Sequence, residues 1–393
     1  MKKILSIVLS VVMIFASATV SFASVSGAND VLRFDENGEF RIFNICDIQD
    51  NYPLHKTAKQ FITDMIEIYD PDIVILGGDN TVASAETKAA AIEELCNIFI
   101  ETDTYFTLVF GNHDDEQGVS REELLALYQQ YGGEYCLAYD ADPEITGVGT
   151  HNLTVKSSDG NSIAYNLYMF DSNSYTYDED GNRLGYDAVH EDQIEWYKNT
   201  SAAVKDANNG NTVHAMAFQH IVVQEAFEEL FIESPVNLGP LTLNFDQKSY
   251  TYLPFVRDIK DGFVLEAPCP GYYNYGQLDA FAETGDVVAV FSGHDHPNTY
   301  TVNKKGVDIV NTPGASFESY GDNSVRGLRL ITINESNTAV YTTEVLTVSD
   351  YILNGGEHLL EFGEITMADA VMGKIQKILM SLYVNLVHLL FTF

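Results

Sequence analysis

The chain has 393 residues, with 57 Asp and Glu against 21 Lys and Arg, and a formal net charge of −36. A chain this acidic is not expected to bind nucleic acid or an anionic membrane by charge, because such binding needs clustered basic residues. Its four cysteines contain no C-x-x-C pair and are too few for a disulfide scaffold. A phosphate-containing ligand would therefore need a stronger attachment than the surface charge, such as a bound metal ion.

Residues 1–23 have the pattern of an export signal. Lys2 and Lys3 precede an apolar stretch, and the sequence SFA at its end fits a small-x-small cleavage site. The alternative is an N-terminal membrane anchor, although the apolar stretch is short for a span of about 20 residues. We therefore predict a signal peptide over residues 1–23 and an exported protein, secreted or held at the cell surface.

Short apolar runs that end in polar residues recur along the chain. The first three are FRIFNICD, DIVILGGDN and TYFTLVFGNHDDE, and the helical patterns HKTAKQFITDMIEIY and SAETKAAAIEELCNIFIET lie between them. Nearly continuous apolar runs are typical of strands buried on both faces. The alternation predicts an α/β sheet, in which ligands bind beyond the carboxyl ends of the strands.

The runs AYNLYMFDSNSY, VHAMAFQHI and DVVAVFSGHDHPN continue this series. Residues 221–285 are rich in aromatic residues and Pro, have little regular period, and are interpreted as a long excursion across the strand ends. The later runs GVDIVNTPGASFES, RGLRLITINE and AVYTTEVLTV are β-rich and hairpin-like, which predicts a second sheet.

Potential metal ligands and proton donors stand at the predicted strand ends. They are Asp47, Gln49, Asp79, Asn112, His113, Asp114, His220, His294 and His296. Carboxylates, amide oxygens and imidazoles are ligands for a pair of divalent ions, which can clamp a phosphoryl group and activate water. Taken singly, Asp79 and Asn112 also fit turn positions and His220 fits a core histidine. Five such clusters at five strand ends favour a metal site.

The ordered motifs DIQ, GGDN, GNHD, QH and GHDH resemble those of the calcineurin-like metallophosphoesterase family, whose motifs read D-x-H, GD, GNH-D/E, H and GHxH. The segments PDIVILGGDN, VFGNHDDE and GDVVAVFSGHDHPN are most similar to the purple-acid-phosphatase-like branch. The resemblance implies a four-layer α/β/β/α sandwich over residues 31–347, with two central mixed sheets flanked by helices. It also implies a metal-dependent hydrolase that cleaves a phosphate monoester or diester by attack of a metal-bridging hydroxide.

The resemblance further implies a role for each residue. Asp79 would bridge two divalent ions, which could be Mn, Fe, Zn or Mg. Asp47 and His296 would complete the protein ligands of one ion, with Gln49 beside it, and Asn112, His220 and His294 would complete those of the other. His113 would protonate the leaving oxygen or steady the phosphoryl group, and Asp114 would orient His113.

Two positions depart from the family pattern. Val82 stands where purple acid phosphatases have a Tyr ligand to ferric iron, so a purple, Tyr-ligated centre is not expected. Gln49 replaces the His of D-x-H, and an amide is a harder and weaker ligand than imidazole, so its ion should be held more loosely or be a harder ion such as Mn or Mg. The alternative function is a non-catalytic metal-containing binding protein that keeps the fold.

Residues 348–393 are predicted to form a C-terminal extension with an apolar helix. No charged residue follows Lys377, and the apolar-dominated run from Ile378 to Phe393 is short for a membrane span. Apolar residues on nearly every face of a helix suit packing against the protein, self-association, or contact with a membrane surface through residues 370–393.

Overall fold

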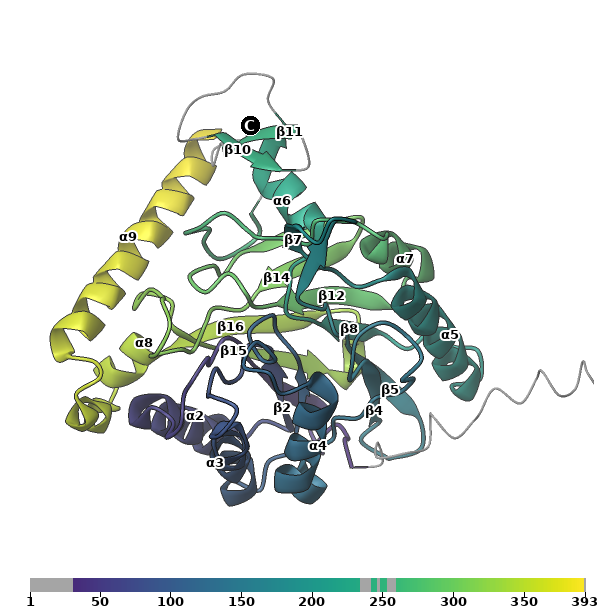
Figure 1. The fold of residues 1–393 in the computed structure, drawn as a ribbon, viewed down its shortest axis with the longest axis horizontal. Helices are drawn as coiled ribbons and strands as arrows, with labels where there is room; N and C mark the ends of the chain where they lie inside the picture. Colours follow the sequence, from purple (N-terminus) through teal and green to yellow (C-terminus); the bar gives the residue numbers. More distant parts are fainter. Residues whose placement is uncertain (1–30, 234–241, 246–247, 253–258, 392–393) are drawn as a thin grey trace, which may run out of the picture.

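The computed structural model describes residues 31–233, 242–245, 248–252 and 259–391 (Figure 1). The predicted signal peptide, residues 1–23, lies outside the described residues. Two mixed β-sheets form the centre of the described part, and helices flank them.

The first sheet has five strands in the order β16-β15-β1-β2-β3. They are β1 (Glu39–Ile45), β2 (Ile73–Gly77), β3 (Phe106–Val109), β15 (Gly327–Asn334) and β16 (Tyr341–Thr347). β1, β2 and β3 run parallel and are connected through α2 (Lys56–Tyr69) and α3 (Lys88–Glu101). The predicted strand–helix alternation over this part of the chain is therefore confirmed.

The second sheet has six strands in the order β13-β14-β12-β8-β5-β4. They are β4 (His151–Lys156), β5 (Ile163–Met169), β8 (Ala215–Phe218), β12 (Val287–Ser292), β13 (Thr301–Lys304) and β14 (Val307–Asn311). β5, β8, β12 and β14 run parallel, and β4 and β13 pair antiparallel at the two edges.

The prediction that the three later runs form a second sheet together is wrong. β14 joins the six-stranded sheet, whereas β15 and β16 form an antiparallel pair that extends the five-stranded sheet. The pairing of β15 with β1, which sets Leu330 opposite Phe43, decides this arrangement. Such pairing links residues far apart in the chain, so the local pattern of each strand does not contain it.

Apolar side chains fill the spaces between four layers. One cluster lies between the two sheets and includes Phe40 and Ile42 of β1 with Met216 and Phe218 of β8. A second joins the five-stranded sheet to α2, α3, α4 (Arg121–Gly132) and α8 (Val348–Leu353), and a third joins the six-stranded sheet to α5 (Glu191–Ala207), α6 (Gln224–Leu230) and α7 (Gln277–Thr284). The predicted α/β/β/α sandwich is confirmed.

The segment 221–285 is more regular than predicted. Its described part contains α6, the strands β9 (Phe231–Glu233), β10 (Thr242–Phe245) and β11 (Lys248–Tyr252), and α7. The three strands form a small antiparallel sheet of their own. A separate hairpin of β6 (Tyr175–Tyr177) and β7 (Arg183–Tyr186) was not predicted.

The C-terminal helix α9 (Met367–Phe391) lies along one side of the molecule (Figure 1). Lys374 and Lys377 near its start contact Asp350 of α8, whereas Met372, Leu379 and Leu382 are largely exposed. No helix in the described ranges is long and apolar enough to cross a membrane. Membrane-surface contact and self-association through residues 370–393 stay predictions.

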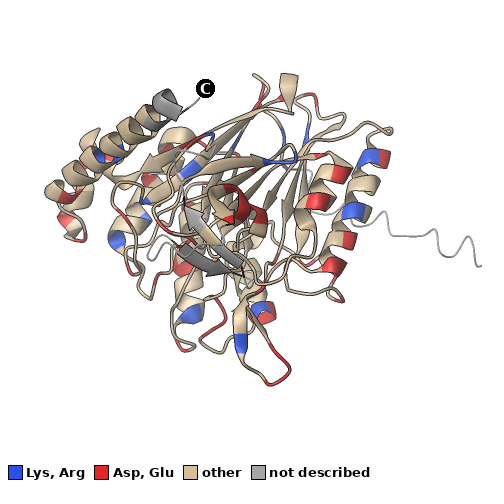
Figure 2. Cartoon of the chain, turned by 90° about the horizontal axis from the view of Figure 1, so that it is seen from above, with Lys and Arg blue, Asp and Glu red and all other residues tan. Residues whose placement is uncertain are grey.

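The acidic residues are not confined to one part of the molecule. Asp and Glu are spread over several helices and loops (Figure 2).

Candidate metal site

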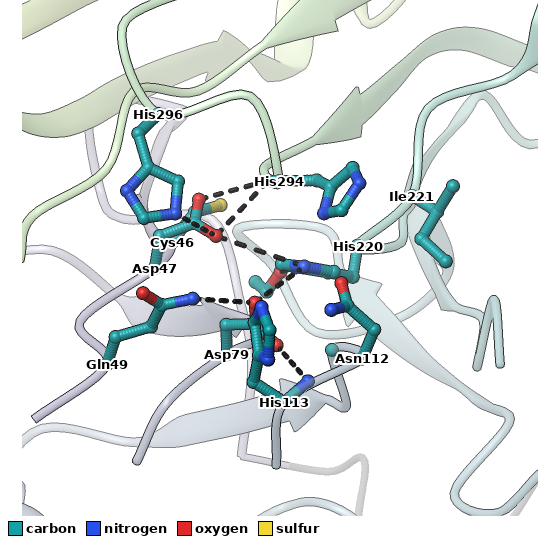
Figure 3. Close-up of polar contacts among 12 residues, drawn as sticks. Cys46, Asp47, Gln49, Asp79, Asn112, His113, His220, Ile221, His294 and His296 are labelled. Atoms are coloured by element: carbon teal, nitrogen blue, oxygen red, sulfur yellow. Dashed lines mark hydrogen bonds and ion pairs between the residues drawn. The ribbon is translucent and has the colours of Figure 1, made fainter. Parts of the chain in front are cut away.

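The predicted ligands come from the ends of five strands. Asp47 and Gln49 follow β1, Asp79 follows β2, Asn112 and His113 follow β3, His220 follows β8, and His294 and His296 follow β12. Because β1 to β3 belong to one sheet and β8 and β12 to the other, both sheets contribute. Figure 3 shows these side chains gathered in one region, as the positions at the strand ends predict.

The backbone at the strand ends is strained. Asp47, Gln49, Asp79 and His294 have φ angles of 52°, 44°, 52° and 70°, in the left-handed region that non-glycine residues rarely adopt. Such conformations cost on the order of 1 kcal/mol or more each and occur preferentially at functional sites. The chain therefore accepts local strain where it positions the candidate ligands.

Two glycines allow the backbone to approach the carboxylates closely. A Cβ atom on Gly111 would lie 2.1 Å from Asp79 Oδ1, and one on Gly293 would lie 2.7 Å from Asp47 Oδ2. Both distances are far below van der Waals contact, so no other residue fits without displacement. The Gly residues of GNHD and GHDH are therefore required for the packing around the two aspartates.

Asp79 is buried and has three polar neighbours in the site. It accepts hydrogen bonds from the backbone N–H of His113 at 2.8 Å and from the Gln49 side chain at 2.9 Å, and its Oδ2 lies 3.2 Å from His220 Nε2. Of the predicted ligands, Gln49 is the one whose amide group contacts Asp79 directly. Its role as a metal ligand stays a prediction.

Asp47 is also buried and connects two of the histidines. It accepts a hydrogen bond from the backbone N–H of His294 at 3.0 Å. Its Oδ1 lies 3.4 Å from His296 Nε2 and 3.9 Å from His220 Nε2. His220 therefore lies between the two carboxylates, while His296 faces Asp47 alone.

Backbone carbonyls hold two of the imidazole rings. His220 Nδ1 lies 3.0 Å from the carbonyl oxygen of Gly77, and His296 Nδ1 lies 2.8 Å from that of Tyr320. Since a carbonyl oxygen can only accept a hydrogen bond, Nδ1 carries the hydrogen in both rings, and Nε2 faces the carboxylates. This arrangement is usual for metal-ligating histidines.

Three buried ligand atoms have no hydrogen-bond partner among the described residues. They are Asn112 Oδ1, His220 Nε2 and His294 Nε2. Asp79, His220 and His294 also bring one ligand atom each within 4.8 Å of one another. Buried polar atoms are nearly always paired, so this group of atoms fits a divalent cation with nitrogen and oxygen ligands.

Burial and charge act differently on the three residues: His294 is neutral, whereas His220 and Asp79 form a charged pair. Burial and the neighbouring His220 ring hold the pKa of His294 well below its usual value, so this imidazole is neutral, as a metal ligand must be. Burial opposes charge on His220 and Asp79 as well, but their mutual attraction outweighs it. Asp79 raises the pKa of His220 to about 9, and His220 holds the pKa of Asp79 below its usual value.

The prediction that Asp114 orients His113 is wrong in this structure. The buried Asp114 carboxylate accepts hydrogen bonds from the backbone N–H groups of Asp79 at 3.0 Å, Asn80 at 2.9 Å and Gly111 at 2.8 Å. These contacts commit its oxygens to the two loops that carry the predicted ligands. Asp114 therefore supports the backbone of the site.

Glu116 is the carboxylate that contacts His113. Its Oε2 lies 2.6 Å from His113 Nδ1, and its Oε1 accepts a hydrogen bond from the Tyr175 hydroxyl at 2.9 Å. In the sequence GNHDDE, Glu116 lies three residues after His113, and this spacing is the available signal for the contact. The catalytic role of His113 itself stays a prediction.

The unpredicted hairpin β6–β7 contributes further side chains beside the site. The Tyr175 hydroxyl accepts a hydrogen bond from Asn112 Nδ2 at 3.1 Å, and the Tyr186 ring packs edge-on against His294 with 4.3 Å between centroids. The Arg183 guanidinium lies over the Tyr175 ring, 3.5 Å from its centroid. The turn sequence DEDGN was the available signal for this hairpin.

Residues 40–298 match the model of the calcineurin-like phosphoesterase family. The matched segment covers more than half of the chain and contains all five motifs at the strand ends. The protein belongs to the calcineurin-like phosphoesterase family, which confirms the predicted resemblance.

Distant relatives carry two kinds of name. "Probable inactive purple acid phosphatase 14" of Arabidopsis thaliana is 25% identical over 352 residues, 81% of each chain. "Phosphatase DCR2" of Saccharomyces cerevisiae is 25% identical over 359 residues, 82% of this chain and 56% of that protein. Among solved structures, a dimetal phosphatase from Danio rerio aligns over 78% of this chain and 98% of its own, with 11% identity and a TM-score of 0.46. Two further Arabidopsis thaliana relatives are also named as probable inactive purple acid phosphatases, whereas DCR2 is named a phosphatase.

Proposed function

We propose that this protein is an exported metal-dependent phosphoesterase that hydrolyses a phosphate monoester or diester. The observation that carries the proposal is the group of buried ligand atoms without a hydrogen-bond partner in the described ranges: Asn112 Oδ1, His220 Nε2 and His294 Nε2. Leaving Asn112 Oδ1 and His294 Nε2 unpaired costs about 1–3 kcal/mol each, and a cation removes that cost. His220 Nε2 lies 3.2 Å from Asp79 Oδ2 and therefore already has a favourable charge partner. Both histidine atoms lie beside the Asp79 carboxylate.

Two divalent ions would suit the proposed ligand set. Asp47, His296 and Gln49 would hold one ion, Asn112, His220 and His294 would hold the other, and Asp79 would contribute to both. When bound, the ions supply charge that polarises the phosphoryl oxygens and lowers the pKa of water. The ions would be Mn, Fe, Zn or Mg. The Gln49 amide, as a harder ligand than imidazole, favours Mn or Mg for the ion next to Gln49.

In the proposed mechanism His113 gives a proton to the leaving oxygen of the ester. Its side chain is 37% exposed, whereas the proposed ligands are buried, so His113 is open to a substrate. The contact of its Nδ1 with Glu116 orients the ring and leaves Nε2 for proton transfer. The guanidinium of Arg183 lies over the Tyr175 ring beside the site and would be a candidate partner for a phosphate oxygen.

Hydrolysis of p-nitrophenyl phosphate and bis(p-nitrophenyl) phosphate by the full chain with added Mn²⁺ tests the proposal. We expect turnover of at least one ester, and a loss of about 10²- to 10⁴-fold in kcat on His113→Ala. His358→Ala, a partly exposed histidine elsewhere on the surface, is the control and should leave kcat unchanged. Equal rates for wild type and His113→Ala would contradict the proposed mechanism.

A non-catalytic metal-containing binding protein is the second candidate. The hydrogen bond between Gln49 and Asp79 favours it, because the family motif has an imidazole at this position and Gln49 weakens one half of the proposed site. The same assay separates the two candidates. Protein that holds its metal by elemental analysis, yet is inert toward both esters, would favour the binding protein.

Export to the cell surface or medium is proposed from residues 1–23 alone. The mature N-terminus of protein recovered from the source cells tests it by mass spectrometry. We expect a chain that begins at residue 24, and an intact N-terminus on cytoplasmic protein would contradict export. The charge of −36 further argues against nucleic acid as a partner.

A further inference from the structure

A second cluster of metal-ligating side chains lies next to the start of α2. Asp50, His55 and Glu318 bring one ligand atom each within 4.8 Å of one another. Asp50 and His55 come from the connection between β1 and α2, and Glu318 comes from the connection between β14 and β15. None of the three belongs to the site described above.

Asp50 carries the strongest signal for a cation. It is fully buried, and its Oδ2 accepts a hydrogen bond from the backbone N–H of His55 at 2.9 Å. Its Oδ1 has no hydrogen-bond partner among the described residues and lies 3.8 Å from His55 Nε2. A buried carboxylate oxygen directed at an imidazole nitrogen and lacking a donor is costly unless a positive charge compensates it.

The His55 ring is oriented as in metal sites. Its Nε2 lies 2.9 Å from Glu318 Oε2, and its Nδ1 lies 3.2 Å from Glu364 Oε1. Glu364 is itself held, because its Oε2 accepts a hydrogen bond from the backbone N–H of Thr57 at 2.9 Å. His55 Nε2 is the ring nitrogen that faces both Asp50 and Glu318, and a metal ion bound there would leave Nδ1 facing Glu364, as in carboxylate–histidine–metal sites.

Glu318 completes the pattern. Its Oε1 accepts a hydrogen bond from Asn51 Nδ2 at 2.9 Å, so Oε2 is the oxygen that faces His55. Asp50 and Glu318 thus each have one oxygen held by a hydrogen bond, and one further atom of each of the three side chains lies within 4.8 Å of those of the other two. The three carboxylates of Asp50, Glu318 and Glu364 exceed the single charge that a protonated His55 could offer, whereas a divalent ion adds the missing positive charge.

We propose that Asp50, His55 and Glu318 bind one divalent ion of the Zn²⁺ or Mn²⁺ class, with Glu364 orienting His55. One imidazole and two carboxylates are suitable ligands for these ions. The ion joins the connection after β1 to the loop that contains Tyr320, whose carbonyl oxygen holds His296. Because Glu364 belongs to the C-terminal extension and contacts His55, the proposed ion also connects this extension to the start of α2. The proposal does not depend on the proposed hydrolysis.

Metal content of the full chain tests the proposal with Zn²⁺ and Mn²⁺ as the probes. The Glu318 side chain is half-exposed, and Gln has nearly the same size and can still accept the hydrogen bond from Asn51. The Glu318→Gln variant should therefore fold. After saturation and removal of free metal, we expect Glu318→Gln and His55→Gln to bind one ion fewer per chain than wild type. Glu344→Gln, an exposed carboxylate on β16, should bind the wild-type number.

A second measurement separates this site from the one near Asp79. His294→Ala should lose metal from that site yet keep the ion that Glu318→Gln loses, and the double variant should lose both. X-ray absorption at the Zn edge, taken as the difference between wild type and Glu318→Gln, should show a single imidazole with oxygen ligands for the ion that the variant loses. Unchanged metal content in both Glu318→Gln and His55→Gln, or a difference spectrum without imidazole, would overturn the proposal.

Discussion

The Gln49 side-chain amide lies 2.9 Å from Asp79 Oδ2, the same oxygen that lies 3.2 Å from His220 Nε2. The residue that departs from the family motif therefore contacts the carboxylate proposed to be shared by the two ions. In the proposed two-ion site, a weaker ligand at this point would affect one ion directly and the shared carboxylate as well. The departure can be tested by restoring the imidazole.

Gln49→His should tighten metal binding. An imidazole is a stronger ligand than an amide for borderline divalent ions, and a gain of ~1.4 kcal/mol corresponds to about tenfold in affinity. Calorimetric titration of the metal-free protein with Mn²⁺ and Zn²⁺ measures the change. Gln129→His, at a glutamine that donates to the carbonyl of Ala138 away from the site, is the control. Unchanged affinity would mean that Gln49 does not ligate the ion.

Glu116→Gln should lower kcat by roughly tenfold, with little change in KM. The carboxylate of Glu116 lies 2.6 Å from His113 Nδ1, and an amide in its place can present a donor to that nitrogen, which disturbs the ring orientation that proton transfer requires. Steady-state kinetics on an aryl phosphate measure the effect. Glu122→Gln in the first turn of α4 should leave kcat unchanged. A variant with normal kcat would show that Glu116 does not position His113.

The positions of the residues at the strand ends were predictable because the sheet topology brings these strand ends close together. Parallel strands bring their carboxyl ends to one edge, so Asp47, Asp79 and Asn112 from β1, β2 and β3 had to lie close together once the alternation was recognised. The glycine-containing motifs marked the same positions. This part of the site depends on local pattern and on one general rule of sheet topology.

The supporting contacts were not predictable in the same way. Tyr186 against His294 and Tyr320 against His296 join segments whose approach depends on loop conformations. The orienting role that the family resemblance implied for Asp114 is not seen, because its carboxylate accepts a hydrogen bond from the backbone of Asp79. Sequence spacing does not say which way such a side chain points.

Asp114→Ala should lower the free energy of unfolding, because Asp114 supports the backbone of the site and does not take part in proton transfer. The variant leaves the backbone N–H groups of Asp79, Asn80 and Gly111 without their buried acceptor. Hydrogen bonds to a charged group contribute about 1.5–3 kcal/mol each, and partial rearrangement should leave a net loss of roughly 3 kcal/mol. Urea denaturation measures the free energy of unfolding. Asp206→Asn, an exposed position on α5, is the control, and a loss below ~1 kcal/mol would contradict the supporting role.

Asp72, just before β2, should make the stability depend on pH. Burial raises the pKa of its carboxyl to about 6, while its Oδ2 accepts a hydrogen bond from the Arg41 backbone N–H at 2.7 Å. An Asp in the unfolded chain titrates near 3.9. Between these two values the folded state binds more protons than the unfolded state, so the free energy of unfolding falls as the pH rises through this window.

Asp72→Asn should remove this pH dependence, because Asn cannot titrate and its Oδ1 can still accept from Arg41. We expect the variant to be no more stable than wild type at pH 4 and more stable by up to ~2 kcal/mol at pH 7, allowing for the partial exposure of the side chain. Urea unfolding at pH 4, 5, 6 and 7 gives the difference between the two proteins, which cancels the titration of all other groups. Parallel stability curves for Asp72→Asn and wild type would mean that burial does not raise the pKa of Asp72.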